Sequence, residues 1–120
     1  MDPIIENFIT SFDPLTSERF KALYQLALES TPHPVEEKLW ARLPTISCGE
    51  KFIRLIPFKD HINIEANGLA AHKDQLAGYR FTPKGMLQIG HEQDIPVEVL
   101  KLIFQESLEE SGRKYTRAGA

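Results

Sequence analysis

Residues 51–66 read KFIRLIPFKDHINIEA, and this stretch decides the fold class. In residues 61–66 polar and apolar side chains alternate at every position, which is typical of a β-strand with one face in water and the other in a core. In residues 51–58, Phe52 and Arg54 share one face of an extended chain, and the aliphatic residues beside them share the other. Only two residues connect the segments, so the sequence predicts an antiparallel hairpin.

A second hairpin is predicted further along the chain. Residues 79–82 and 86–89 are short strand-like segments on either side of Pro83-Lys84-Gly85. Glycine supplies the unusual backbone angles that a tight turn requires. Together the two hairpins predict an antiparallel sheet of about four to five short strands.

Helical periodicity surrounds these strands. The clearest helix has apolar residues at i, i+3, i+4, i+7 and i+8, the spacing of one helical face; they are Phe20, Leu23, Tyr24, Ala27 and Leu28. The helices that we expect are residues 3–12, a helix capped by Thr16 or Ser17 that ends at Thr31-Pro32, residues 34–43, residues 70–77, and a helix from Ile95-Pro96 to Gly112. This order predicts an α+β fold, with the sheet packed by the N-terminal helices and the C-terminal helix.

The helix expected at residues 34–43 rests mainly on its first turn. Pro34 suits the first position of a helix, and Glu36 and Glu37 suit its positive N-terminal end. Trp40 would lie beside its apolar face, and the proline that follows residue 43 would end it.

The composition is that of one ordinary globular domain. The chain has 120 residues, of which 42% are hydrophobic and 26% are charged. We expect a single domain over residues 1–112, followed by a basic, disordered tail at residues 113–120. The one cysteine, Cys48, excludes an intrachain disulfide, and neither a signal peptide nor a membrane-spanning run is evident. We therefore expect a cytoplasmic protein with no membrane partner.

The charge pattern argues against nucleic acid as a partner. The net charge is −3, and no stretch of the folded body is strongly basic. Non-specific binding to nucleic acid needs a field of Lys and Arg against the phosphates. Only the tail, with Arg113, Lys114 and Arg117, has such a character, so we expect no nucleic-acid partner.

Three glutamates at the end of the last expected helix form a candidate metal site. Glu106, Glu109 and Glu110 fall at i, i+3 and i+4, so they share one helical face. Negative charge is unfavourable near a helix C-terminus, and a local rule broken without an evident gain is a place to look for function. Clustered carboxylates suit divalent iron, manganese, magnesium or calcium. The alternative is a solvated face that the basic tail neutralises.

Four ring-bearing residues are candidates for a ligand groove between the helices and the sheet. They are Trp40, Phe58, His61 and Tyr79. The alternative for the three aromatic residues is the core, and the alternative for His61 is a turn exposed to water. No nucleophile, base and orienting group form a recognisable set, so the sequence gives no reason to expect an enzyme.

Four segments form an ordered set along the chain: Trp40-x-x-x-Pro44, Phe58-Lys59-Asp60-His61-Ile62, Tyr79-x-x-Thr82-x-Lys84-Gly85-x-x-Gln88-Ile89 and Ile95-Pro96. This order resembles the YdhG-like family of bacterial domains over about residues 8–110. The resemblance implies a compact α+β fold with an antiparallel sheet and flanking helices. Some members are described as frataxin-like intracellular iron chaperones, so it also implies an iron role, although it brings no ligand motif that maps onto this chain.

Two functions are therefore expected as alternatives. The first is a small protein that binds or delivers iron, using the carboxylates and a metal-accepting or other protein partner. The second is a protein-interaction or small-ligand module that uses the groove and has no metal role.

Overall fold

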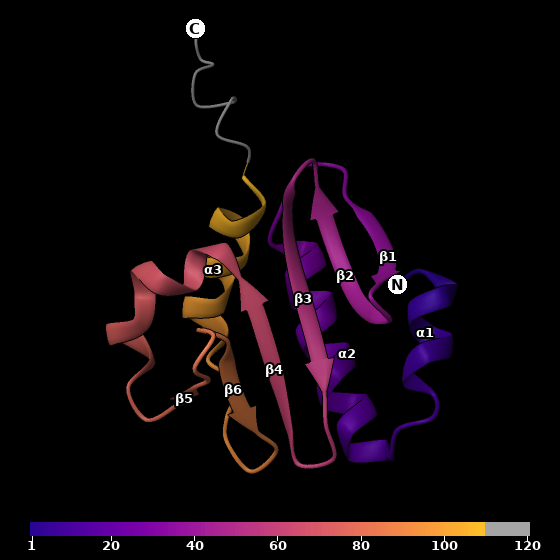
Figure 1. Cartoon of the computed structure of the whole chain (residues 1–120), viewed down its shortest axis with the longest axis horizontal. Helices are drawn as coiled ribbons and strands as arrows, with labels where there is room; N and C mark the ends of the chain where they lie inside the picture. The colour runs from indigo at the N-terminus through magenta and orange to yellow at the C-terminus, as the bar shows by residue number, and fades with distance from the viewer. Residues whose placement is uncertain (110–120) are drawn as a thin grey trace, which may run out of the picture.

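The computed structural model describes residues 1–109 and confirms the predicted α+β class (Figure 1). In chain order the elements are α1 (Pro3–Ile9), α2 (Pro14–Glu29), β1 (Glu36–Trp40), β2 (Leu43–Cys48), β3 (Lys51–Pro57), β4 (His61–Ala66), the 3₁₀ helix η1 (Asn67–Leu76), β5 (Arg80–Phe81), β6 (Leu87–Gly90) and α3 (Val97–Leu108). The strands form one antiparallel six-stranded sheet in the order β1-β2-β3-β4-β6-β5. Glu110 and the tail predicted at residues 113–120 lie outside the described residues.

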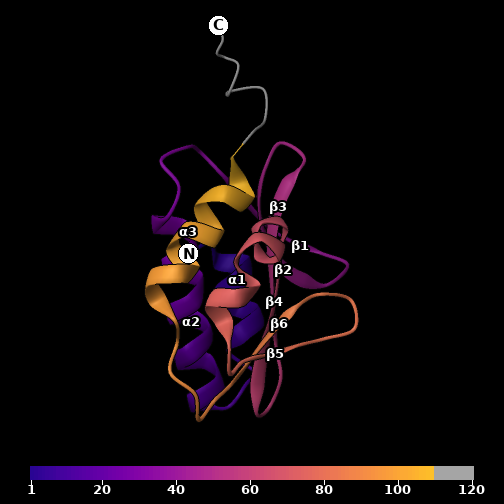
Figure 2. The ribbon, with the colours of Figure 1, turned by 90° about the vertical axis from the view of Figure 1, so that its left-hand side faces the viewer.

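The long helices pack on one face of the sheet. Figure 2 shows α2 and α3 on the same side of the strands, and α1 lies beside the edge strand β1 in Figure 1. Within residues 1–109 no helix covers the opposite face, which we call the open face. In the same part of the chain, no helix combines the length and apolar character that crossing a membrane requires.

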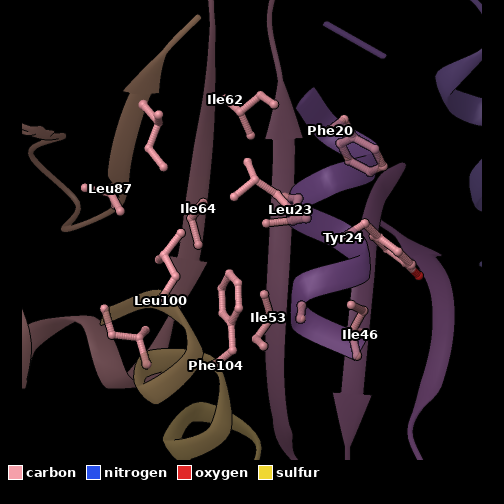
Figure 3. Close-up of a cluster of buried hydrophobic side chains, with 14 of the residues drawn as sticks. Phe20, Leu23, Tyr24, Ile46, Ile53, Ile62, Ile64, Leu87, Leu100 and Phe104 are labelled. Atoms are coloured by element: carbon pink, nitrogen blue, oxygen red, sulfur yellow. The ribbon is translucent and has the colours of Figure 1, made fainter. Parts of the chain in front are cut away.

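The core lies between this sheet and the two long helices (Figure 3). The prediction that the apolar residues of the 61–66 strand face the core is confirmed, because Ile62 is 1% exposed and Ile64 is 0% exposed. The antiparallel register sets Leu55 opposite Ile64, and the neighbouring strands supply further aliphatic pairs. From the helices, the core receives Phe20, Leu23, Tyr24, Leu100 and Phe104.

The helix predicted at residues 34–43 is wrong, because this segment forms the first β-hairpin. β1 runs antiparallel to β2, and Ala41 and Arg42 form the turn with φ values of 53° and 68°. A two-residue hairpin turn with positive φ at both positions is usually built from Asn and Gly. Because neither residue is present, the sequence contains no turn signal, and the acidic pair after Pro34 resembles a helix start instead.

Smaller differences concern the ends of the elements. α1 ends at Ile9 rather than residue 12, and α2 begins at Pro14, where Asp13 and not Thr16 or Ser17 caps the helix. The segment predicted as a helix over residues 70–77 is the 3₁₀ helix η1, and α3 ends at Leu108. The strand β2 was not predicted, since its residues include Pro44 and lie next to the supposed helix.

A glycine fixes η1 closely against α3. The backbone N–H of Gly68 donates to Ser107 Oγ over 2.8 Å, and Ser107 Oγ donates to the carbonyl oxygen of Ile103. A Cβ on Gly68 would lie 2.9 Å from that carbonyl oxygen, closer than side-chain carbons approach. The close approach holds the start of η1 at the end of the sheet.

Glu37 joins three elements on the helical side of β1. Its Oε1 accepts hydrogen bonds from the Tyr24 hydroxyl and from the backbone N–H of Asp2, each over 2.8 Å. Tyr24 is 0% exposed, and burial, followed by its bond to the Glu37 carboxylate, raises the pKa of its hydroxyl above the usual value. The folded state therefore holds the proton of Tyr24 more tightly than the unfolded state does.

Stability should fall at alkaline pH because of this tyrosine. The contribution is fully present below a pH of about 10, where an unfolded tyrosine is neutral, and is lost as the pH rises through the raised pKa of the folded state. Between a pH of about 10 and the raised pKa of the folded state, we expect the free energy of unfolding to fall by about 1.4 kcal/mol more per pH unit in the wild type than in Tyr24→Phe. Urea denaturation at several pH values measures both slopes, and parallel curves would contradict the assignment.

Candidate binding surface

The structure separates the four residues predicted for a ligand groove. Phe58 and His61 stack on each other at the β3–β4 turn, with ring centroids 4.5 Å apart. Tyr79 lies between η1 and β5 and donates from its hydroxyl to the carbonyl oxygen of Asp94 over 2.6 Å. Trp40 is at the end of β1, in a different set of contacts. The structure thus brings Phe58 and His61 together and gives each of the others separate partners.

The candidate metal site is only partly described. Glu106 lies on α3, and its Oε1 is 2.9 Å from Nε2 of His72 on η1. The pKa of His72 is raised because its ring nitrogens donate hydrogen bonds to the amide oxygen of Gln75, the larger effect, and to the carboxylate of Glu106. Glu109 is exposed at the end of α3, and Glu110 lies outside the described residues. Within residues 1–109, no group of three or more His, Cys, Asp or Glu side chains is arranged to hold a metal ion.

The most distinctive surface feature is a cluster of Trp40, Phe52 and Arg54 on the open face. The rings of Trp40 and Phe52 meet edge to face, with centroids 5.9 Å apart. The Arg54 guanidinium carbon lies 4.5 Å from the Trp40 ring centroid and 4.8 Å from that of Phe52. Both separations are within the range of a cation–π contact. We call these three residues the aromatic cluster.

The strand order explains how the aromatic cluster forms. Trp40 is on β1, whereas Phe52 and Arg54 are on β3, so the indole must reach across β2. On this face β2 presents the short side chains of Thr45 and Ser47, which are 1% and 6% exposed. They are buried although no helix of residues 1–109 covers them. The indole therefore packs on one side against the sheet and faces outward on the other.

An ion pair holds the centre of the aromatic cluster. Arg54 Nη1 donates to Glu65 Oε1 on the neighbouring strand β4 over 2.7 Å, and the Arg54 side chain is only 12% exposed. Trp40, in contrast, is 54% exposed. The aromatic cluster is therefore held by contacts with the sheet and still exposes its tryptophan ring to solvent.

Two depressions adjoin the aromatic cluster and share Glu50, Lys51 and Phe52 in their walls. The smaller has a volume of about 270 Å³ and lies over β2, with Trp40 on its far side. The larger, of about 440 Å³, extends toward η1 and the β5–β6 loop. There the Lys73 ammonium lies 4.9 Å from the ring centroid of Phe81. The two depressions lie side by side at one end of the open face, with Phe52 in the wall that they share, and we call them together the groove.

The sequence pattern predicted only part of the aromatic cluster. The alternation in residues 51–58 already placed Phe52 and Arg54 on the same strand face. Trp40 was recognised as a candidate, but it was assigned to a helix and so could not be connected with β3.

Comparisons of the chain with family models, with curated proteins and with solved structures find no match. The chemistry of the surface must therefore be argued from its own residues. An aromatic ring with one free face can stack on a planar group, and ammonium groups beside it can neutralise an anion. The arrangement is suited to binding.

Loss of the guanidinium should loosen the aromatic cluster. Trp40 is the only tryptophan in the chain, so its fluorescence reports on this site alone. In Arg54→Ala we expect emission at longer wavelength and lower anisotropy, because water replaces the guanidinium beside the indole. Arg80→Ala, an exposed arginine on β5, is the matched control and should leave the spectrum unchanged. Identical spectra for all three proteins would show that Arg54 does not hold the indole.

Proposed function

We propose that this protein is a small binding protein and that the aromatic cluster on the open face is its recognition surface. The observation that carries the proposal is the state of Trp40, which is more than half exposed and yet held in place by Phe52 and Arg54. A side chain already fixed in the free protein loses little conformational entropy on binding. The single cysteine excludes an intrachain disulfide and supports placing the protein in the cytoplasm.

The residue types of the aromatic cluster support the same proposal. Trp and Arg are among the side chains that most often dominate the energy of an interface. An aromatic ring that served only the fold would gain more from burial in the core, where Phe20 and Phe104 are both 0% exposed. The adjoining groove offers the concave relief in which a ligand or a partner side chain can be enclosed.

Selection from a random peptide library tests the use of this surface. With the wild type as bait, we expect the selected peptides to bind Trp40→Ala and Arg54→Ala at least about tenfold more weakly, as for the loss of a hot-spot residue. Leu102→Ala is the matched control, since Leu102 is 46% exposed on α3, on the helical side. Peptides that bind Trp40→Ala as well as the wild type, or that require Leu102, would place the preferred surface elsewhere.

Iron binding is the second candidate function, and the contact between His72 and Glu106 is the observation that favours it. An imidazole and a carboxylate from two different elements are ligand types that divalent iron accepts. The neighbouring Glu109, and Glu110 beyond the described residues, would supply further oxygens. This candidate rests on the resemblance to the YdhG-like family together with that contact.

Anaerobic titration with ferrous iron separates this candidate from the first. We expect the wild type to bind Fe²⁺, and the triple variant Glu106→Gln, Glu109→Gln, Glu110→Gln to bind at least about tenfold more weakly, because charged oxygen ligands are lost. Glu98→Gln is the control, because that carboxylate lies on the same helix and its side chain is 90% exposed. Equal weak binding by all three proteins would remove the glutamates from the argument.

A further inference from the structure

The fold gathers basic side chains on the open face that are scattered along the sequence. Six lie on this face or at its rim. Strand register places Lys38, Arg54 and Arg80 on the open face. Lys73 and Lys84 line the larger depression, and Lys51, which shares the strand face of Ile53, lines both depressions from the end of β3. They come from β1, β3, η1, β5 and the β5–β6 loop, so no stretch of residues 1–109 is strongly basic. The same region carries three glutamates, Glu36, Glu50 and Glu65, of which Glu65 is paired with Arg54 and Glu36 with Lys38.

The rest of the described chain has the opposite character. Outside this region, residues 1–109 contain thirteen acidic and five basic side chains. The rest of the described chain is therefore acidic overall, and the region of the open face is basic. Such segregation gives the molecule a directed field that draws a polyanion to one face and repels it from the other.

Aromatic rings are interleaved with these cations along the groove. Trp40, Phe52 and Phe81 line it from β1 to the β5–β6 loop, and Lys38, Lys51, Lys73 and Lys84 lie between or beside them. Figure 2 shows that the β1–β2 turn and the β5–β6 loop both project beyond the sheet on the side away from the helices.

We infer that the open face binds single-stranded nucleic acid, with bases stacked on the aromatic cluster and phosphates beside the lysines. The inference rests on the proposed function and names the partner of the same surface. A positive groove with exposed aromatic rings is the arrangement that holds single strands without sequence preference. A duplex would not fit this chemistry, because its bases are already stacked on one another and cannot reach Trp40.

An acidic peptide is the alternative partner, and two observations disfavour it. Carboxylates are recognised best by a free guanidinium fork, and Arg54 already donates to Glu65. The remaining cations that line the groove are lysines, which act as point charges toward phosphate oxygens. The outward face of the Trp40 indole also has the flat shape of a base rather than of an aspartate or glutamate side chain.

Fluorescence anisotropy with labelled oligo(dT) and oligo(rU) of about 10 nucleotides tests the inference at about 50 mM salt. We expect Lys51→Gln, Lys84→Gln to bind roughly tenfold more weakly and to lower the slope of log K against log salt by about 1.4, since two phosphate contacts are lost. We expect Trp40→Ala to bind at least about fivefold more weakly through the loss of one stacked base. Urea denaturation verifies that each variant is folded.

The matched control removes the same charge from the other side of the molecule. Lys21→Gln, Lys101→Gln alters exposed lysines on α2 and α3, and its affinity should stay within about twofold of the wild type, because these residues face away from the groove. A third variant, Arg113→Gln, Lys114→Gln, Arg117→Gln, neutralises the C-terminal tail. Binding that depends on the tail or on the control lysines, and not on Lys51 and Lys84, would overturn the inference.

The remaining outcomes separate this inference from the proposed function. If a polyglutamate peptide binds in a Trp40-dependent manner and neither oligonucleotide binds, the nucleic-acid inference is overturned while the recognition surface stands. If no oligonucleotide and no acidic peptide binds, the nucleic-acid inference is again overturned. The peptide selection alone then tests whether the aromatic cluster is a recognition surface. Trp40-dependent oligonucleotide binding with the expected salt slope would support both.

Discussion

The packing of α2 and α3 against a single face of the sheet is the constraint on which the rest of the structure depends. A strand buries every second side chain, so one helical layer can cover only half of what the sheet presents. The covered half includes Ile53, Ile62 and Ile64, which are at most 1% exposed. On the open face, the side chains of the sheet itself must shield the backbone and the polar groups from water. The chemistry of the open face follows from that requirement.

On the open face, long side chains lie over short ones and shield them from water. Thr45 and Ser47 on β2 are almost completely buried beneath the neighbouring aromatic cluster, although no helix lies above them. Arg54 serves two purposes, because it packs on both rings and neutralises Glu65. A partly exposed ion pair of this kind adds little stability by itself. Its main effect is to fix where the Trp40 indole lies, and a fixed, exposed aromatic ring is what binding requires.

The sequence predicted those features whose signal is local. Alternation in residues 61–66 identified β4, and helical spacing from Phe20 onward identified α2, because each pattern lies within one element. The β1–β2 hairpin could not be predicted in this way, since Ala41 and Arg42 carry no turn signal. With the hairpin lost, Trp40 had no partner on β3. The basic character of the open face was also out of reach, because charges from five separate segments meet only after folding.

The β1–β2 turn places backbone strain directly beside Trp40. Positive φ values at Ala41 and Arg42 cost about 1 kcal/mol each relative to residues that favour this region. Such strain persists only where the surrounding structure fixes it, and here the pairing of Trp40 with Leu43 closes the hairpin directly beside it. Asn-Gly at these positions would relieve the strain. The strained turn thus fixes the end of β1, and with it the backbone from which the Trp40 indole reaches toward β3.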